Sequence, residues 1–301
     1  MKLHILDTHF QGMAQVTAVY LVVGPEGPVL VESGPGSTLP AILKALDGHG
    51  FGPADVRAVL LTHIHLDHAG AAGWWARQGA QLYVHHVGAP HLIDPSKLLA
   101  SATRIYGEAN MARLWGDVLP APAERVTLVY DGDRIEAGGL TFTALDTPGH
   151  AYHHHTYRLR DYREGELAFS GDAAGVHLPL VELVDLPAPP PEFHMETWLK
   201  TLDRLDRAGL KTLYPTHFGP VHDVHGHLVA LRGLMVDAVA FVAQRQATGA
   251  GRDAILDDYI AWNRQRARAA ALSSAALDRY EAANPLFMSV DGILRYLRKR
   301  G

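Results

Sequence analysis

Short apolar runs, separated by glycine and proline, fill the first two-thirds of the chain. Their length and their content of β-branched and aromatic residues are typical of strands. The predicted strands are Ala18–Val23, Val29–Glu32, Val56–Leu61, Leu82–Val84, Leu140–Leu145, Thr156–Leu159, Leu167–Phe169 and Thr212–Tyr214. Two other segments, Thr38–Asp47 and Glu196–Ala208, carry apolar residues at helical spacing and are predicted helices. This mixture of strands and helices predicts a layered α/β (α+β) fold.

The segment Pro95–Pro122 interrupts this alternation. Its apolar residues, among them Leu98, Ile105 and Trp115, follow a helical pattern between prolines. The pattern predicts a helical insertion over about residues 95–122. Two interpretations remain open, because such an insertion can pack on the surface as a helix pair or form an apolar cap over a pocket.

From about Val224 onward the strand pattern ends and only helical patterns follow. The predicted helices are Leu228–Gln246, Ala254–Ala271, Ser274–Ala283 and Val290–Lys299. We therefore predict a catalytic domain over residues 1–223 and a C-terminal helical region over residues 224–301 that completes or caps it. The sequence shows no internal repeat.

The composition of the chain limits the partners, the location and the metal ligands that we expect. The chain has 301 residues, 48% of them hydrophobic, and its 27 Lys and Arg face 32 Asp and Glu, so nucleic acid is not expected as a partner. The N-terminus lacks a signal peptide, and no stretch approaches the roughly 20 apolar residues that cross a bilayer. We expect a cytoplasmic protein without a membrane partner. Because the chain has no cysteine, any transition metal must be held by nitrogen and oxygen ligands.

Metal-capable side chains follow several predicted strands. The run THIHLDHAG at Thr62–Gly70 comes directly after Val56–Leu61 and contains four of them. If the strand continued, the alternation of side chains would place His63 and His65 on the same face. A turn at Leu66 would then direct Asp67 and His68 toward the same point. Later strands are followed by three more, so that the full set is His63, His65, Asp67, His68, His150, Asp172 and His217. Strand ends gather at one edge of such a fold, so we expect the set to converge.

The order HxHxDH, TPGH, SGD and a late histidine, between Thr62 and His217, resembles the metallo-β-lactamase superfamily, and within it the glyoxalase II and lactonase branch. The resemblance implies a four-layer αββα sandwich with the metals at the edge between the sheets and, here, a C-terminal helical extension. It implies two metal-binding sets joined by a bridging carboxylate: His63, His65 and His150; Asp67, His68 and His217; and the bridge Asp172. The implied cofactors are two divalent cations, with zinc expected and iron or manganese open.

The implied reaction is hydrolysis of a carboxylic ester, thioester or lactone of a small acyl substrate. Two divalent cations between imidazoles bring the pKa of a shared water toward neutrality and stabilise a developing oxyanion. Asp67 and Asp172 are the expected catalytic residues, since one contacts that water and the other bridges the metals. The sequence leaves a homodimer open.

Substrate contacts are predicted at three positions outside the ligand set: His177, which follows the bridging aspartate, and Trp115 and Phe193, which are apolar. The N-acyl homoserine lactonases carry a tyrosine three residues after the bridging aspartate, where this chain has Gly175. The residues that could replace it are Tyr20, Tyr106, Tyr152 and His177.

The other histidines and the basic tail receive plainer interpretations. The run His153–His155 is either an outer shell that orients the ligands or unrelated to the site, and strand alternation predicts that His154 points elsewhere. Glyoxalase II enzymes bind glutathione with basic residues. Here Arg295, Arg298, Lys299 and Arg300 are instead interpreted as favourable charges at a helix C-terminus.

Two other functions are compatible with parts of the pattern. A mononuclear iron oxidoreductase resembling the persulfide dioxygenases would share the motif, but it would leave Asp67, His68 and His217 without a role. An RNA-processing nuclease would use the C-terminal helices. The arginine-rich stretch Asn263–Arg268 is its only sequence support, and such stretches are more often solvated helix faces.

Overall fold

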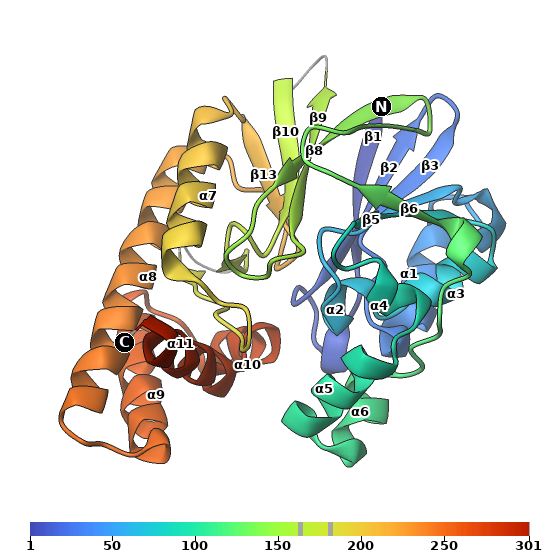
Figure 1. Ribbon diagram of the computed structural model, residues 1–301. Coiled ribbons are helices and arrows are strands. Elements are labelled where there is room, and N and C mark those ends of the chain that lie inside the picture. The colour runs from blue at the N-terminus through green and yellow to red at the C-terminus, as the bar shows by residue number, and fades with distance from the viewer. Residues whose placement is uncertain (162–164, 180–182, 301) are drawn as a thin grey trace.

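The computed structural model describes residues 1–161, 165–179 and 183–300 (Figure 1). Its centre is a pair of sheets. The six-stranded sheet has the order β1 (Lys2–Asp7), β2 (Ala18–Gly24), β3 (Gly27–Val31), β4 (Ala58–Leu60), β5 (Gln81–His85) and β6 (Val126–Val129). The five-stranded sheet has the order β13 (Thr212–Pro215), β10 (Gly165–Gly171), β9 (His155–Asp161), β8 (Leu140–Asp146) and β7 (Arg134–Ala137). A short ribbon pairs β11 (Val176–His177) with β12 (Val184–Asp185).

The two sheets pack face to face, and strand alternation decides which side chains fill the space between them. Tyr20 and Val22 of β2 join Phe142 and Phe169 in the core between the sheets. Leu21, which lies between them in sequence, joins the core under the helices on the other face. Both faces of the central strands are therefore buried, which is why their sequences read as continuous apolar runs.

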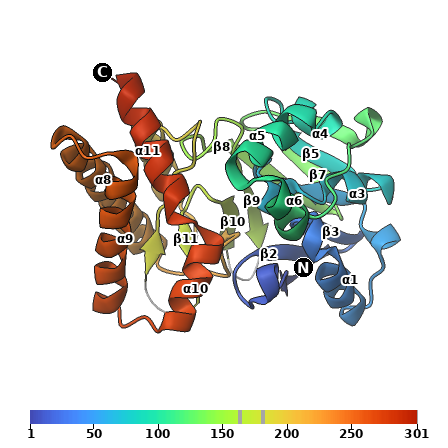
Figure 2. The same cartoon turned by 90° about the horizontal axis from the view of Figure 1, so that it is seen from below.

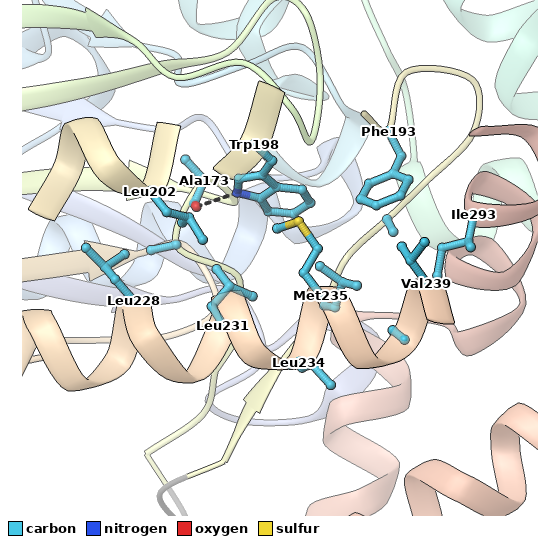
Figure 3. Close-up of a cluster of buried hydrophobic side chains, with 14 of the residues drawn as sticks. Ala173, Phe193, Trp198, Leu202, Leu228, Leu231, Leu234, Met235, Val239 and Ile293 are labelled. Carbon is cyan, nitrogen blue, oxygen red and sulfur yellow. Dashed lines mark hydrogen bonds between the residues drawn. The ribbon is translucent and has the colours of Figure 1, made fainter. Parts of the chain in front are cut away.

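Helices cover the two outer faces. On the six-stranded sheet, α1 (Leu39–Gly48) and α3 (Ala72–Arg77) bury Ile42, Leu46 and Trp75. On the five-stranded sheet, α7 (Met195–Arg207) and α8 (Val224–Ala247) enclose Trp198 and Met235, as Figure 3 shows. The layers are helix, sheet, sheet and helix, so the predicted αββα sandwich is confirmed.

The insertion contains the two helices α5 (Ser96–Tyr106) and α6 (Glu108–Trp115). The C-terminal region contains α8, α9 (Arg252–Ala269), α10 (Ser274–Ala283) and α11 (Leu286–Arg300). Figure 2 shows α5 and α6 on one side of the molecule and α10 and α11 on the other. The remaining short helices are α2 (Leu66–Ala69), α4 (Pro90–Ile93) and the 3₁₀ turns Phe10–Gly12, Gly36–Thr38, Pro53–Asp55 and Ala123–Arg125.

Within the described residues, α8 alone is long and apolar enough to cross a membrane by length and composition. It contacts α7, α9 and α11, and its Leu231, Met235 and Val242 are completely buried between them. A helix with one face in a protein core passes the same length and composition test, and α8 packs in this way, with Val229 and Val236 exposed on its other face.

The structure corrects the sequence prediction at several elements. Strands β1, β6 and β7 were not predicted, because they are short or carry as many polar as apolar residues. More important for the site, β4 ends at Leu60, so His63 and His65 do not lie in a strand. They lie in an irregular segment between β4 and α2, and strand alternation does not set their directions.

Candidate metal centre

The seven predicted ligands come together at one edge of the sandwich. The segment after β4 carries His63 and His65, and α2 then turns the chain so that Asp67 and His68 face the same region. His150 follows β8, Asp172 follows β10, and His217 follows β13. The side chains group into three overlapping sets whose donor atoms lie within 4.8 Å of one another: His63, His65 and His150; Asp67, His68 and His217; and His63, His68 and Asp172.

The first set is a trio of imidazoles. Nδ1 of His65 lies 2.9 Å from Nε2 of His63 and 2.9 Å from Nε2 of His150. Burial, reinforced by the neighbouring imidazoles, holds the pKa of His63 and of His65 well below the ordinary histidine value. Burial also lowers the pKa of His150. These rings are therefore neutral at pH 7, which is the form that binds a metal.

The second set adds a carboxylate. Oδ2 of Asp67 lies 3.5 Å from Nε2 of His68 and 3.3 Å from Nε2 of His217. Burial would raise the pKa of Asp67, but His68 and His217 outweigh it and lower the pKa to about 2. Asp67 is thus ionised over the whole range in which the protein would be assayed.

Asp172 lies between the two sets. Its Oδ2 is 3.3 Å from Nε2 of His150, in the first set. Its Oδ1 is 3.3 Å from Nε2 of His68 and 3.6 Å from Nε2 of His217, in the second. One carboxylate therefore offers one oxygen to each set, which is the arrangement of a bridging ligand in a two-metal site.

Hydrogen bonds on the far side of the rings fix which nitrogen faces inward. Nδ1 of His150 donates to the carbonyl oxygen of Pro187, and Nδ1 of His217 donates to that of Val16, each at 2.8 Å. Nδ1 of His68 lies 2.9 Å from Oε1 of Glu32. In all three rings Nε2 therefore faces the carboxylates of Asp67 and Asp172. Once such a ring is neutral, Nε2 carries the lone pair that can bind a metal.

This arrangement fits divalent cations. Nε2 of His68, Nε2 of His217 and Oδ1 of Asp172 are buried and have no hydrogen-bond partner. These atoms stabilise one another only when a positive charge, either a proton or a metal cation, lies among them. Burial lowers the pKa of His68, but Asp67, Asp172 and Glu32 outweigh it and hold that pKa well above the ordinary value. The site thus favours positive charge, and nitrogen and oxygen donors of this kind suit zinc, iron or manganese.

Glu32, at the end of β3, is a site residue that the sequence reading missed. It is completely buried and accepts hydrogen bonds from the hydroxyl groups of Thr62 at 2.6 Å and Thr216 at 2.9 Å, besides its contact with His68. Its backbone has a φ of 70°, a conformation that side chains other than glycine rarely adopt and that clusters at functional sites. The available signal was a charged residue at the end of an apolar strand.

The prediction that the side chain of His154 points away from the site is wrong. Strand β9 begins only at His155, so a turn sets the direction of His154. Its Nε2 accepts from the backbone N–H of Asp172 at 3.1 Å, and its Nδ1 lies 2.8 Å from the hydroxyl of Thr147. The ring stacks on His63 with centroids 4.9 Å apart. His154 therefore supports both Asp172 and His63.

His155 belongs to a separate cluster with His85 and Asp146. Nε2 of His155 lies 2.7 Å from Oδ1 of Asp146, and Nε2 of His85 lies 3.6 Å from the same atom. Nδ1 of His85 accepts from the backbone N–H of Val87, so Nε2 carries the ring proton. The hydrogen bond in this cluster joins His155 to Asp146, and His85 lies beside it.

Trp198 of α7, drawn with its hydrogen bond to Ala173 in Figure 3, packs against the site. Its indole N–H donates to the carbonyl oxygen of Ala173 at 2.8 Å, which fixes the turn after Asp172. Its ring meets His150 edge to face at a centroid distance of 5.7 Å. Gly149 has a φ of 134°, and a Cβ there would lie 2.3 Å from Cβ of Trp198, so only glycine fits beside this ring.

The C-terminal helix α11 holds the segment that supports His150. The hydroxyl of Ser289 donates to the carbonyl oxygen of Leu186 at 2.8 Å and accepts from the N–H of Ala188 at 3.2 Å. A Cβ at Gly292 would lie 1.9 Å from the carbonyl oxygen of Ala188, so the helix packs directly on this backbone. Pro187, between these two anchored residues, is the hydrogen-bond partner of His150.

A cavity of about 310 Å³ opens beside the centre, and His65, Asp67, His150 and Asp172 form part of its wall. Of the three predicted substrate contacts, Trp115 lines it. Phe193 does not: it is buried in the core against Trp198 and Tyr296. His177 does not either, because it lies in β11, where its backbone N–H donates to the carbonyl oxygen of His217.

The three tyrosines considered as replacements for the lactonase tyrosine lie in different environments. The hydroxyl of Tyr20 is engaged by the backbone of Pro215 and Gly219, and Tyr152 is exposed. Tyr106 lines the cavity. Burial, with a smaller contribution from Asp67, raises its pKa above the usual range, so its hydroxyl keeps its proton and can donate.

His153 lines the cavity without belonging to a metal-binding set. Its Nε2 lies 3.4 Å from Oε2 of Glu192, and its Nδ1 accepts weakly from the N–H of Ile64 at 3.5 Å. Replacing His153 with alanine should leave metal content unchanged and lower turnover by less than about tenfold, whereas His150→Ala should remove metal. Metal analysis of both purified variants checks this, and equal metal loss from the two would mean that His153 is a ligand.

The fold and the paired donor sets define a class of protein: an αββα sandwich with a candidate two-metal centre at the edge between its sheets. Residues 13–217 match the model of the metallo-beta-lactamase superfamily, more than half of the chain, and the protein belongs to that superfamily.

Known proteins resemble the chain to different extents. The lactamase-like protein adaB of Aspergillus niger is 26% identical over 251 residues, which cover 80% of this chain and 64% of that protein. The atrochrysone carboxyl ACP thioesterase nsrC of Aspergillus novofumigatus is 26% identical over 247 residues, 79% of this chain and 60% of that one. The chain thus spans less than two-thirds of the length of these two relatives. The crystal structure of the metallo-beta-lactamase family protein TTHA1429 from Thermus thermophilus has the same fold, with a TM-score of 0.69 and 23% identity over 99% of this chain and 94% of that one.

Proposed function

We propose that the protein is a binuclear metal-dependent hydrolase, with zinc as the expected metal, that cleaves a carboxylic ester, thioester or lactone. One observation carries the proposal: Asp172 offers one carboxylate oxygen to each of two ligand sets beside an apolar cavity. The proposed reaction type follows the resemblance of the ligand motif to the glyoxalase II and lactonase branch. Among the three substrate classes, the name of the thioesterase relative supports a thioester.

The residues of this chain would have distinct roles in metal binding and hydrolysis. His63, His65, His150, Asp67, His68, His217 and Asp172 would hold two divalent cations. When bound, such cations act as Lewis acids and lower the pKa of a water toward neutrality. The ionised carboxylate of Asp67 accepts a hydrogen bond from the attacking water and so orients it. The protonated hydroxyl of Tyr106 donates toward the substrate oxygen that gains charge.

The cavity argues for an acyl substrate over a nucleic acid. Its wall outside the metal-facing end is mainly leucine, isoleucine, proline and aromatic side chains. Phosphodiester binding needs several cations along the path of the backbone. Among the described residues that line the cavity, Lys97 is the only lysine or arginine.

Metal analysis followed by a hydrolase screen tests the proposal. The purified protein should contain two divalent cations per chain and hydrolyse octanoyl thioesters, aryl octanoates or acyl lactones. It should leave bis(p-nitrophenyl) phosphate intact. Dialysis against a chelator should abolish turnover, and added zinc should restore it. One iron per chain, with oxygen consumption on glutathione persulfide, would overturn the proposal in favour of an oxidoreductase.

A further inference from the structure

Three segments outside the ligand set build the walls of the cavity. Helix α5 contributes Leu98, Ser101, Ala102, Ile105 and Tyr106, whose spacing of three and four residues forms one helix face. The proline-rich segment over residues 187–192 contributes a second wall. The junction of α10 and α11 contributes the third, with Ala283, Asn284, Pro285 and Met288. Figure 2 shows that α5 faces α10 and α11 across the molecule.

The described residues that the C-terminal region contributes to this cavity are mainly apolar and include no cation. Among the described residues, no arginine or lysine of these helices lines the cavity. Some pair elsewhere: Arg252 with Asp291 at 2.8 Å, and Arg300 with Glu196 at 3.4 Å. Arg266 donates to the side chain of Asn263 and the carbonyl oxygen of Val184. With Lys97 of α5 as the single lysine or arginine among the described lining residues, the cavity has too few cations for a multiply charged group such as the two carboxylates of glutathione.

We infer that this cavity is an acyl-chain subsite, and that Ser101 of α5 and Met288 of α11 set the length of the chain it accepts. The inference rests on the proposed function, because the metal-facing end of the cavity is where the acyl carbonyl would react. The remaining apolar walls then receive the hydrocarbon chain. The C-terminal helices thus determine specificity as well as support His150.

The dimensions select a chain of medium length. The lined face of α5 from Leu98 to Tyr106 extends about 12 Å along the helix axis. The cavity of about 310 Å³ accepts on the order of ten groups the size of a water molecule. A linear octanoyl or decanoyl group fits this space, whereas a butanoyl group leaves much of it unfilled.

Burial of the chain predicts a graded substrate preference. Each methylene moved from water into the apolar cavity should raise kcat/KM about fourfold until the cavity is full. For the wild-type protein, kcat/KM should therefore rise steeply from butanoyl to octanoyl thioesters and level off or fall at dodecanoyl.

Neighbouring positions on α5 provide a matched pair of variants. Ser101 lines the cavity, whereas Ala100 is exposed on the other side of the helix. Ser101→Phe should lower kcat/KM for octanoyl thioesters at least tenfold and change that for butanoyl thioesters less than threefold. Ala100→Phe should match the wild type for both. Met288→Ala enlarges the opposite wall and should shift the optimum toward dodecanoyl.

Binding of decanoate to the metal-loaded protein, measured by calorimetry, separates this inference from the proposed function. Decanoate should bind the wild type and Ala100→Phe, and at least tenfold more weakly to Ser101→Phe. If acyl thioesters are hydrolysed but Ser101→Phe and Met288→Ala keep the wild-type length profile, the subsite is wrong and the function stands. If no acyl substrate is hydrolysed but decanoate binding follows the predicted order, the function is wrong and the subsite stands. If decanoate does not bind the wild type, the subsite is overturned.

Discussion

Replacing Asp172 with alanine should lower turnover by at least about a hundredfold and reduce the metal content from two cations per chain to one or fewer. The reason is its position, with one oxygen 3.3 Å from His150 in the first set and the other 3.3 Å from His68 in the second. Removing the carboxylate takes a ligand from both sets at once. It also removes negative charge that would balance two divalent cations in a buried site.

The variant Asp172→Asn distinguishes the effect of losing the negative charge from the effect of losing the size of the side chain. The amide keeps the size of the side chain but is a poor bridging ligand, so it should behave like alanine in metal content and turnover. Asp206→Ala is the control, because Asp206 pairs only with His225 at the surface and should change neither quantity. Metal analysis of each purified variant, together with initial rates on an octanoyl thioester, provides both readouts. Full turnover of Asp172→Ala with two cations bound would mean that Asp172 is not the bridge.

The convergence of the seven candidate ligands could be predicted because residue type and order carry most of the information. His150, Asp172 and His217 each follow an apolar run, and apolar runs of this kind became the central strands of the sandwich. Ends of neighbouring strands are held together by the sheet, whatever the details of the loops. An error in the predicted path between β4 and α2 therefore did not affect the prediction that these side chains converge.

The outer support of the ligands could not be predicted, because it depends on local turns and on contacts that are distant in sequence. The direction of His154 depends on β9 starting one residue later than that side chain. Phe193 was predicted to line a groove, but the segment after the prolines turns it into the core against Trp198. The wall formed by Pro285 and Met288 depends on where the C-terminal helices dock, and helical periodicity alone does not specify docking.

Glu32 provides the second prediction, because the structure makes it the common anchor of three residues around the second ligand set. Replacing Glu32 with glutamine should weaken binding of the second cation by about tenfold to a hundredfold and leave the first much less affected. The amide cannot accept all the hydrogen bonds that the carboxylate receives from Thr62, Thr216 and His68. His68 then loses the contact that orients its Nε2 toward Asp172.

Stepwise titration with a competing zinc chelator measures the two affinities separately. Glu26→Gln, at an exposed position, controls for loss of one negative charge and should leave both affinities unchanged. Thr216→Val removes one of the donors to Glu32 and should produce a smaller loss at the second cation alone. Equal weakening of both cations in Glu32→Gln would point to a general loss of folding, and unchanged affinities would show that His68 is oriented without Glu32. The predicted outcome, a selective loss at the second cation, would explain why a charged side chain occupies a buried and strained position at the end of β3.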